Sequence, residues 1–401
     1  MADKILQAIH SKFKGTCDVL HVHNPTLAKN LSFQKILKSL AQKNTKLFLQ
    51  IHDFAEDGRP AAYFAEDYVA DCHYGVINSR DYDILLKAGL KKEGLHKIFN
   101  TIHPREPKSR CDRPSSSVLY PIRAIRRKNI GEAILLSLFF RSGESLAITL
   151  PPNSPADYKS YEGWKAFAEQ QHLRVEFEKG LNRDFKKLVD SAKYLITTSI
   201  NEGFGFSFLE PWLYAKLLWG RKLSGICHDF EKNGVLLDHL YLKLLIPVEW
   251  VGYDELYQQW RSWVLKTCAL FQFPIAEPHL KASFENLTAQ GTIDFGLLHE
   301  SFQKQIIIRI LRRKKNAERM RELNPFLVRP GEVPDQMVLI QNNRRAVLDN
   351  YNPSLYRQQL LKIYEVVCQT DIEQKIDKKV LLAAFLDLNE FSLLKWSEYH
   401  D

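Results

Sequence analysis

The stretch TTSINEGFGFSFLEPW, residues 197 to 212, decides how the rest of the chain is interpreted. The residues before its turn, Ala192 to Ile200, are mostly apolar and predict a short strand. The residues after the turn, Phe208 to Leu218, predict a largely apolar helix. Glu202 and Glu210 flank the turn, which contains two glycines. A strand, a glycine-containing turn and a helix N-terminus favour anion binding, because backbone N–H groups and the helix dipole point at the turn.

The same residues also have a local structural explanation. Ser207 and Glu210 have the spacing of a capping box, in which Glu210 would only stabilise the start of the helix. Gly203 and Gly205 could be turn residues that bind no ligand. The turn alone therefore leaves a structural and a functional interpretation open.

The pattern of Glu202, the Gly-Phe-Gly turn and Glu210 resembles the hallmark of retaining GT-B glycosyltransferases of family 4, which includes sucrose synthases and bacterial mannosyltransferases. In that family the first glutamate faces the donor sugar and the second binds the nucleotide ribose. The resemblance implies a catalytic role for Glu202 and a donor-binding role for Glu210. It also implies that the donor diphosphate lies near the backbone amides of Gly203, Phe204, Gly205 and Phe206.

Arg123 and Lys128 form a second motif, at the strand-to-helix turn that opens the second half of the chain. In family 4 an arginine and a lysine at this spacing bind the donor diphosphate, and they would neutralise the leaving group as the glycosidic bond breaks. A solvated basic turn is the alternative, because Arg126 and Arg127 lie beside them, and Arg126 could replace Arg123. With such cations no metal and no cofactor is expected. The co-substrate implied is a nucleoside-diphosphate sugar.

The composition is that of a two-domain protein of the reducing cytoplasm. The 401 residues are enough for two cores, and the formal charge of +9 suits a nucleotide-sugar, a lipid headgroup or nucleic acid. Six scattered cysteines without close pairs indicate reduced thiols. The first residues lack the apolar region of a signal peptide, and no stretch is long enough for a membrane span.

Strands alternate with helices in both halves of the chain, which predicts the α/β class. With the resemblance, the expected fold is GT-B, with two Rossmann-like domains facing a central cleft. The expected divisions are an acceptor-side domain (1–104), a linker (105–117), a nucleotide-sugar-binding domain with a helical insertion (118–334), and C-terminal helices that cross back to the first domain (335–401).

The individual elements follow from apolar spacing. In the first domain we expect strands over 18–23, 46–51, 74–78 and 97–102, and helices over 31–42 and 79–88. In the second domain we expect strands over 118–121, 145–150, 173–177, 192–200 and 223–227, and helices over 130–138, 158–170, 183–191 and 208–218.

The first domain is expected to be shortened. Members of family 4 usually begin with a strand and a Gly-rich loop, but roughly 17 residues precede Asp18 here, which is enough for one helix only. We therefore expect a sheet of about four strands and a cleft that is more open on the acceptor side. Either a mis-assigned start codon or loss of the unit in this lineage would explain it.

His52 and Asp53 follow the second expected strand and resemble the histidine that family 4 enzymes aim at the donor sugar, so both are candidate catalytic residues. A metal site made of His21, His23 and Asp53 is an alternative, because residues 21 and 23 share one strand face. A further alternative is that His21 and His23 are only hydrogen-bonded polar groups at a strand end. Asp81 and Asp83 have the spacing of a metal-binding Asp-x-Asp, but carboxylates are also favoured in the first turn of a helix.

The run from Arg309 to Arg321 is rich in basic residues. A solvated helix face is the first interpretation, and contact with an anionic membrane is the second. Nucleic acid is not expected as a partner, because no aromatic residues interleave with the charges. The sequence of the tail 371–401 indicates no function.

The sequence thus predicts a cytoplasmic, metal-independent retaining glycosyltransferase, which could be peripheral at the inner membrane face. It would transfer a hexose from a nucleoside-diphosphate sugar to an unidentified acceptor: a sugar, a lipid-linked glycan or a small metabolite. Two alternatives remain. A non-catalytic GT-B relative would bind a nucleotide-sugar or a partner without transfer, and a phosphorylase-like enzyme would need a pyridoxal-phosphate lysine, for which no motif is present.

Overall fold

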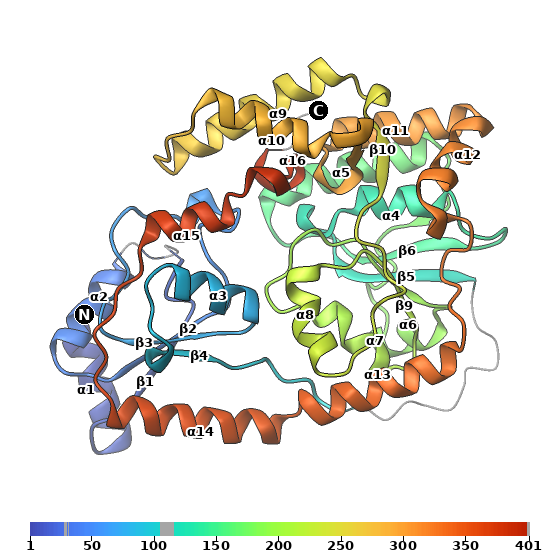
Figure 1. Ribbon diagram of the computed structural model, residues 1–401. Coiled ribbons are helices and arrows are strands. Elements are labelled where there is room, and N and C mark those ends of the chain that lie inside the picture. Colours follow the sequence, from blue (N-terminus) through green and yellow to red (C-terminus); the bar gives the residue numbers. More distant parts are fainter. Residues whose placement is uncertain (28–29, 31, 105–115, 399–401) are drawn as a thin grey trace. The chain divides into compact units, whose positions relative to one another are not determined.

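A computed structural model of the chain describes residues 1–27, 30, 32–104 and 116–398 (Figure 1). The described residues of 1–103, 268–273 and 350–387 form the first of two compact units, and those of 104–267, 274–349 and 388–398 form the second. Each unit has its own parallel sheet, so the predicted α/β class is confirmed. Residues 105–115 of the predicted linker lie outside the described residues.

The first unit has a parallel sheet of four strands, the number that the sequence predicts, and their order is β1-β2-β3-β4. The strands are β1 (Leu20–His23), β2 (Leu47–Ile51), β3 (His73–Val76) and β4 (Leu95–Lys97). The predicted position of β4, residues 97–102, was wrong. Strand β3 ends at Val76, where the chain enters a helix, so β4 has no pairing partner beyond that point. The last hydrogen bond between the two strands runs from Ile98 N–H to the Val76 carbonyl and is 2.9 Å long.

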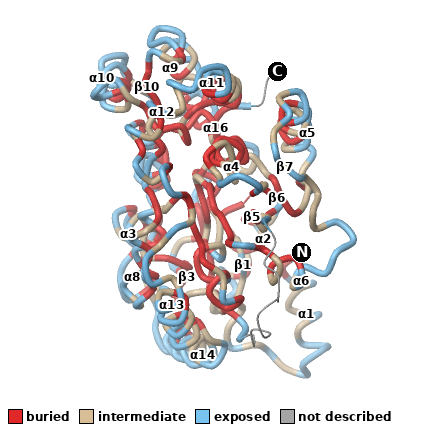
Figure 2. Tube along the Cα trace, turned by 90° about the vertical axis from the view of Figure 1, so that its right-hand side faces the viewer, coloured by how far each residue is buried: buried red, intermediate tan, exposed pale blue. Residues whose placement is uncertain are grey.

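The helices of the first unit are α1 (Ala2–Phe13), α2 (Phe33–Gln42), α3 (Ser79–Lys87), α14 (Pro353–Gln369) and α15 (Lys378–Phe385), with short 3-10 turns η1 (Pro60–Ala62) and η2 (Lys92–Gly94). Alternation along β2 divides the core into two layers. Leu49 and Ile51 face the larger cluster, to which α1, α2, α3 and α15 contribute. Phe48 faces the opposite way and packs on Ile363 and Val367 of α14. The central strands β2 and β3 are buried, whereas β1 and β4 at the two edges are only partly buried (Figure 2).

A layer of histidines lies on the Phe48 side of this sheet. The ring centroids of His21 and Phe48 are 4.7 Å apart, those of Phe48 and His96 are 5.8 Å apart, and His73 stacks on His96 at 5.2 Å. Tyr364 of α14 hydrogen-bonds His21 Nδ1 at 2.8 Å. Helix α14 is therefore tied to this histidine layer.

The second unit has a five-stranded parallel sheet in the order β7-β6-β5-β8-β9. Its strands are β5 (Ser117–Arg123), β6 (Ser145–Leu150), β7 (Val175–Glu176), β8 (Leu195–Thr197) and β9 (Leu218–Gly220), and the helices between them are α4 (Ile130–Ser137), α5 (Pro155–Gln170), α6 (Phe185–Ser191) and α7 (Glu210–Leu213). The remaining helices are α8 (Ser224–Lys232), α9 (Tyr253–Leu270), α10 (Glu277–Leu287), α11 (Glu300–Arg312), α12 (Lys314–Leu323), α13 (Gln336–Asn350) and α16 (Leu393–Trp396). Helix α9 ends in the first unit, where Phe271 packs on Tyr63.

Short elements complete the second unit. Strands β10 (Leu245–Pro247) and β11 (Thr292–Asp294) form an antiparallel pair. The 3-10 turns are η3 (Arg126–Lys128), η4 (Phe206–Phe208), η5 (Val248–Trp250), η6 (Ala289–Gly291), η7 (Phe295–Leu297), η8 (Pro325–Leu327) and η9 (Leu388–Glu390).

Two predicted elements of the second unit were wrong. The helix expected over 208–218 ends at Leu213, because Ala215 takes a left-handed conformation with φ 52° and the next apolar residues form β9. The strand expected over 223–227 is the start of α8. The edge of the sheet is already occupied by β9, and Ile226 and Phe230 are buried at helical spacing.

The C-terminal region also differs from the expected return of 335–401 to the first domain. Residues 350–387 belong to the first unit, but 335–349 and 388–398 belong to the second. Aromatic packing explains the final change of unit. Phe391 packs against Trp260, with ring centroids 5.9 Å apart, and stacks on Trp396. Among the described residues, no helix has the length and apolar character needed to cross a membrane.

The histidine layer predicts acid sensitivity. Burial lowers the pKa of His21 and of His96 to about 4, below the ordinary value of about 6.5 expected in the unfolded chain. The unfolded state therefore takes up protons first, so stability is complete above pH 6.5 and is lost as the pH falls toward 4. We expect the thermal midpoint to fall across this range, and to fall less in a His21→Gln, His96→Gln double variant. His10→Gln, at an exposed position of α1, is the control. Equal pH profiles for all three proteins would contradict the prediction.

Candidate functional site

The structure brings together two predicted site residues from separate motifs. Lys128 Nζ donates to Glu202 Oε1 over 2.5 Å, and the side chains are 15% and 9% exposed. Lys128 ends η3, which follows β5, and Glu202 lies in the turn after β8. Strands β5 and β8 are neighbours in the sheet, so their carboxyl ends bring the two turns to one edge. In α/β sheets this edge is where ligands bind.

The Lys128 turn is held by hydroxyl groups of β5 and of the segment after β8. The carbonyl of Lys128 accepts hydrogen bonds from Tyr120 Oη at 2.7 Å and from Thr198 Oγ1 at 3.0 Å. Ile200 N–H donates to the carbonyl of Arg127 at 3.0 Å. These bonds join the two turns through their backbones, so the Lys128–Glu202 contact is built into the fold and does not depend on two flexible side chains alone.

Asn129 links the turn to the helix that follows it. It has a left-handed backbone with φ 52°, which asparagine tolerates better than most residues. Its side chain donates to Glu132 Oε2 at 2.8 Å and accepts from Gln303 Nε2 at 3.0 Å. The turn therefore continues directly into a buried network under α4.

The centre of that network is Arg221, which lies between two carboxylates. Its guanidinium donates to Glu132 at 2.9 and 2.7 Å and to Asp294 at 2.7 Å from each of two nitrogens. Tyr241 Oη donates to Glu132 at 2.6 Å. Burial works against the charge of Arg221, but Asp294 and Glu132 together raise its pKa well above the usual value. Such forked, charge-assisted bonds fix the positions of all three backbones.

The glycine turn requires a residue without a side chain at position 205. Its φ is +94°, and an added Cβ would lie 2.8 Å from Ile226 Cγ2. Phe204 is buried against Phe230 with ring centroids 5.6 Å apart, whereas Phe206 is 40% exposed. Gly203 is half-buried beside them. The turn is thus anchored by one phenylalanine and presents the other to solvent.

The capping-box interpretation of Glu210 does not hold. Ser207 lies inside η4, and its buried hydroxyl has no hydrogen-bond partner in the described part of the chain. Glu210 is exposed at the first position of α7. Because α7 has a single turn, its dipole is much weaker than that of the longer helix the sequence predicted, and Lys128 is the stronger source of positive charge here.

The two arginines of the basic motif have different surroundings. Arg123 is exposed at the end of β5. Arg126 donates to both oxygens of Glu300, at 2.8 and 2.5 Å, and its side chain is 12% exposed. Arg126 is therefore engaged in the interior and does not replace Arg123 as an accessible cation.

In the first unit, His52 and Asp53 follow β2 as expected. The side-chain oxygen of Asn24 accepts from both of their backbone N–H groups, at 2.9 and 3.2 Å. His52 Nε2 and His23 Nδ1 share a hydrogen bond of 2.8 Å, and Asp53 pairs with Arg59 at 2.6 Å. Burial lowers the pKa of His52, which favours a neutral imidazole.

These contacts do not support the proposed metal alternatives. His21 bonds Tyr364 and Gln50 through its two ring nitrogens, at 2.8 and 2.9 Å, so both of its possible metal-binding atoms are engaged. Asp81 is buried and bonds Asn78 and Arg80, as expected for a residue of the first helical turn. Over residues 1–27, 30, 32–104 and 116–398, no three His, Cys, Asp or Glu side chains are grouped so that they could hold a metal.

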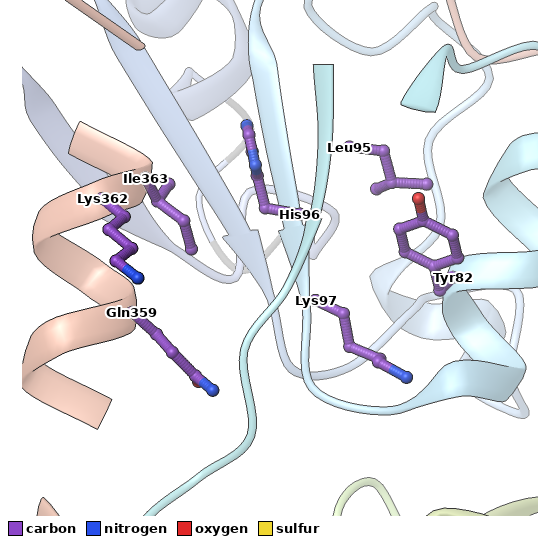
Figure 3. Close-up of a pocket in the computed structure, with 7 residues that line it drawn as sticks. All are labelled: Tyr82, Leu95, His96, Lys97, Gln359, Lys362 and Ile363. Carbon is purple, nitrogen blue, oxygen red and sulfur yellow. The ribbon is translucent and has the colours of Figure 1, made fainter. Parts of the chain in front are cut away.

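The first unit also has an open groove of about 520 Å³ (Figure 3). It spans the edge strand β4, with α3 on one side and α14 on the other, and none of the predicted site residues lines it. Lys97 and Lys362 give it positive charge. Its lining residues are Tyr82, Leu95, His96, Lys97, Gln359, Lys362 and Ile363.

Comparisons with known proteins identify a related sequence and related folds. The chain is 23% identical over 445 residues to mannosylglucosyl-3-phosphoglycerate synthase of Petrotoga mobilis, covering 98% of this chain and 84% of that protein. TarM of S. aureus superimposes with a TM-score of 0.50 and 13% identity over 90% of this chain, which spans only 57% of TarM. Anabaena HepE, solved with UDP-glucose, superimposes with a TM-score of 0.50 and 13% identity. The match covers 91% of this chain and 81% of HepE. No protein-family model matches.

The fold is that of the GT-B glycosyltransferases. The expected fold class is therefore confirmed. In the GT-B framework, the Lys128–Glu202 pair lies in the second, C-terminal unit. The individual roles of Glu202, Glu210, Arg123, His52 and Asp53 stay predictions.

The basic run of α11 and α12 is partly occupied by internal contacts. The guanidinium of Arg309 lies over Trp250 at 5.5 Å from the ring centroid, and that of Arg321 over Phe139 at 5.1 Å. Arg319 pairs with Glu322 at 3.2 Å. These contacts favour the solvated helix face, and membrane contact stays a prediction.

Sequence reasoning missed the residues that support the site. Tyr120 and Thr198 were treated as parts of strands, and Glu132 and Arg221 as parts of a helix and a loop. One signal was present: Glu132 lies in an otherwise apolar helix start, IGEAILL, and a carboxylate in such a position needs a partner. The identity of that partner, 89 residues away, depends on the tertiary fold.

Replacement of Gly205 tests the turn. Gly205→Ala combines a positive φ with a contact of 2.8 Å, whereas Gly143→Ala has a similar φ of +88° in open space. We expect Gly143→Ala to lower the free energy of unfolding by about 1 kcal/mol, and Gly205→Ala to lower it by about 1–3 kcal/mol more. Urea unfolding of both variants measures the difference. Equal losses would show that the turn has room for a side chain.

Proposed function

We propose that the chain is a retaining glycosyltransferase that transfers a hexose from a nucleoside-diphosphate sugar to an acceptor hydroxyl. The observation that carries the proposal is the Lys128–Glu202 pair, at the carboxyl edge of the second sheet of a GT-B fold. A lysine and a carboxylate held together at this edge supply a cation for the diphosphate and a polar group for the sugar.

The donor would be bound by groups of the second unit. Lys128 would leave Glu202 and contact the diphosphate, and Arg123 would add a second cation. The amides of the turn from Gly203 to Phe206 would face the diphosphate, Glu202 the sugar and Glu210 the ribose. The exposed ring of Phe206 is available beside them. The catalytic roles of His52 and Asp53, in the first unit, stay predictions from the family resemblance.

In the transfer step, the bond between the anomeric carbon and the donor phosphate oxygen breaks, and the acceptor oxygen forms a new bond on the same face. The acceptor proton passes to the departing phosphate oxygen, so no protein base is required. The protein contributes charge stabilisation and positioning, and Lys128 and Arg123 counter the negative charge that develops on the leaving diphosphate.

The acceptor class that we favour is a small phosphorylated metabolite. The support is the name of the Petrotoga mobilis relative, a mannosylglucosyl-3-phosphoglycerate synthase, which this chain matches over 98% of its length. A basic protein with net charge +9 also suits an anionic acceptor. We further propose a cytoplasmic location, in agreement with free thiols at Cys17, Cys72, Cys227, Cys268 and Cys368.

A second candidate is a GT-B relative that binds a nucleotide-sugar without transferring it. The observation in its favour is that Glu202 already neutralises Lys128, so a donor must compete with an internal carboxylate. Calorimetry with UDP, GDP and ADP, followed by donor-hydrolysis and transfer assays, distinguishes the two. Nucleotide binding with no turnover on any donor would favour the second candidate.

Two substitutions test the catalytic pair. Glu202→Gln keeps the shape of the side chain and removes its charge, and Lys128→Ala removes the cation. Each is expected to raise the barrier by about 2–4 kcal/mol, which lowers kcat/KM roughly 30- to 1000-fold. Lys187→Ala, at an exposed position of α6, is the control and should leave the rate unchanged. Wild-type rates in both site variants would rule out this mechanism.

Metal independence is the last test of the proposal. If Lys128 and Arg123 neutralise the leaving diphosphate, a divalent ion is not needed for that role. We expect transfer rates to be the same with and without EDTA. A complete loss on EDTA that manganese restores would contradict this assignment.

A further inference from the structure

Residues 388–398 of the C-terminal tail contact η3, the turn that carries Lys128. Residues 388–398 pack on the second unit, where Ser392 Oγ donates to the carbonyl of Gly296 at 3.0 Å and the aromatic pair Phe391 and Trp396 packs near Trp260. This packing directs the next backbone carbonyls toward η3. The preceding part of the tail, 371–387, belongs to the first unit.

The contact point of the tail is the side chain of Arg126. Nε and Nη2 of Arg126 bind Glu300, and Nη1 donates to the backbone carbonyl of Ser397. The next tail residue repeats the pattern, because the carbonyl of Glu398 hydrogen-bonds His299 Nε2 at 3.2 Å. Glu300 is 1% exposed and also accepts from Ser160 Oγ at 2.8 Å. The tail thus completes a buried polar cluster.

Arg126 is also the first residue of the turn that ends in Lys128. Its backbone N–H donates to Asp157 Oδ1 at 2.9 Å, and its carbonyl accepts from Asn129 N–H at 2.8 Å. The N–H of Lys128 donates to the carbonyl of Ile125 at 2.9 Å. Because the turn is this short, a shift of Arg126 moves Lys128 with it.

Removal of Ser397 would take its carbonyl and its Oγ away from a largely buried guanidinium and leave further N–H donors without acceptors. Arginine has five N–H donors and no way to lose its charge, and an unsatisfied buried donor costs about 1–3 kcal/mol. Arg126 can recover this energy only by moving toward water. Such a movement would displace the η3 turn, which carries the lysine of the proposed site.

We propose that the tail residues Ser397 and Glu398 hold η3 in its donor-binding conformation, and that Arg126 is the positioning residue through which they act. Arg126 touches no donor atom in this scheme, since its guanidinium is used by Glu300 and Ser397. The inference rests on the proposed function, because it assumes that Lys128 binds the donor diphosphate. It gives the tail, which has no role in the predicted transfer reaction, a defined part in donor binding.

Two truncations separate this effect from loss of folding. A chain ending at Trp396 loses both carbonyl contacts but keeps the aromatic packing, and a chain ending at Glu398 keeps both and is the matched control. We expect the shorter chain to bind UDP or another nucleoside diphosphate about tenfold more weakly by calorimetry, with a higher donor KM and a smaller change in kcat. Its thermal midpoint should stay within a few degrees of the control.

Arg126→Gln provides the second arm. If the tail acts through Arg126, truncation at Trp396 in the Arg126→Gln variant should change nucleotide affinity less than twofold. If the tail and Arg126 acted independently, their effects on the binding free energy would add. Equal affinities of the two truncated chains in the wild-type background would overturn the proposal. The proposal would also be overturned if truncation at Trp396 weakened nucleotide binding by the same factor in Arg126→Gln as in the wild-type background.

Hydrogen exchange keeps the test independent of the proposed function. Amides of the turn from Ile125 to Asn129 should exchange faster in the chain ending at Trp396 than in the chain ending at Glu398. If no nucleotide binds either chain but exchange increases, the donor assignment fails and the tail contact stands. If nucleotide binds and exchange in the turn is unchanged, the positioning role fails and the donor assignment stands.

Discussion

The second unit depends on one buried interaction, the placement of Arg221 between Glu132 and Asp294. These three residues come from the end of β9, from α4 and from β11, so the network joins the sheet, the helix after the Lys128 turn and the helical part of the unit. The contact is so close that a Cβ at Gly296 would lie 2.8 Å from the guanidinium. Removal of one partner of a buried ion pair typically costs about 3–5 kcal/mol. Because Asn129 bonds Glu132, the same network fixes the start of α4 and, with it, the turn that carries Lys128.

The proposed site is thus held on a rigid support, and its lysine is paired with its carboxylate. Lys128 and Glu202 neutralise each other, and hydroxyls of Tyr120 and Thr198 fix the backbone beside them. A donor diphosphate has to offer Lys128 a better partner than one carboxylate, which a doubly charged group does. The exchange would also release Glu202 toward the sugar. Donor binding and exposure of the catalytic carboxylate would therefore occur in one step.

The sequence predicted the parts of the fold that follow from local patterns. Apolar runs located β2, β6 and β8, and the family resemblance assigned Lys128 to the donor diphosphate and Glu202 to the donor sugar. Elements whose identity depends on distant residues were missed. The segment 223–227 is apolar enough for a strand, but β9 already occupies the sheet edge beside β8, so the segment forms α8. Arg126 and Arg123 look equivalent in sequence, and only the buried Glu300 distinguishes them. The return of 388–398 to the second unit likewise depends on Trp260, far away in the chain.

The central claim is that Lys128 exchanges Glu202 for a donor diphosphate, and a crystal structure of the chain with a bound nucleoside diphosphate tests it most directly. The account predicts diphosphate oxygens within hydrogen-bond reach of Lys128 Nζ and of the amides between Gly203 and Phe206, with the 2.5 Å contact to Glu202 opened. A nucleotide bound elsewhere, with Lys128 and Glu202 still paired, would contradict it.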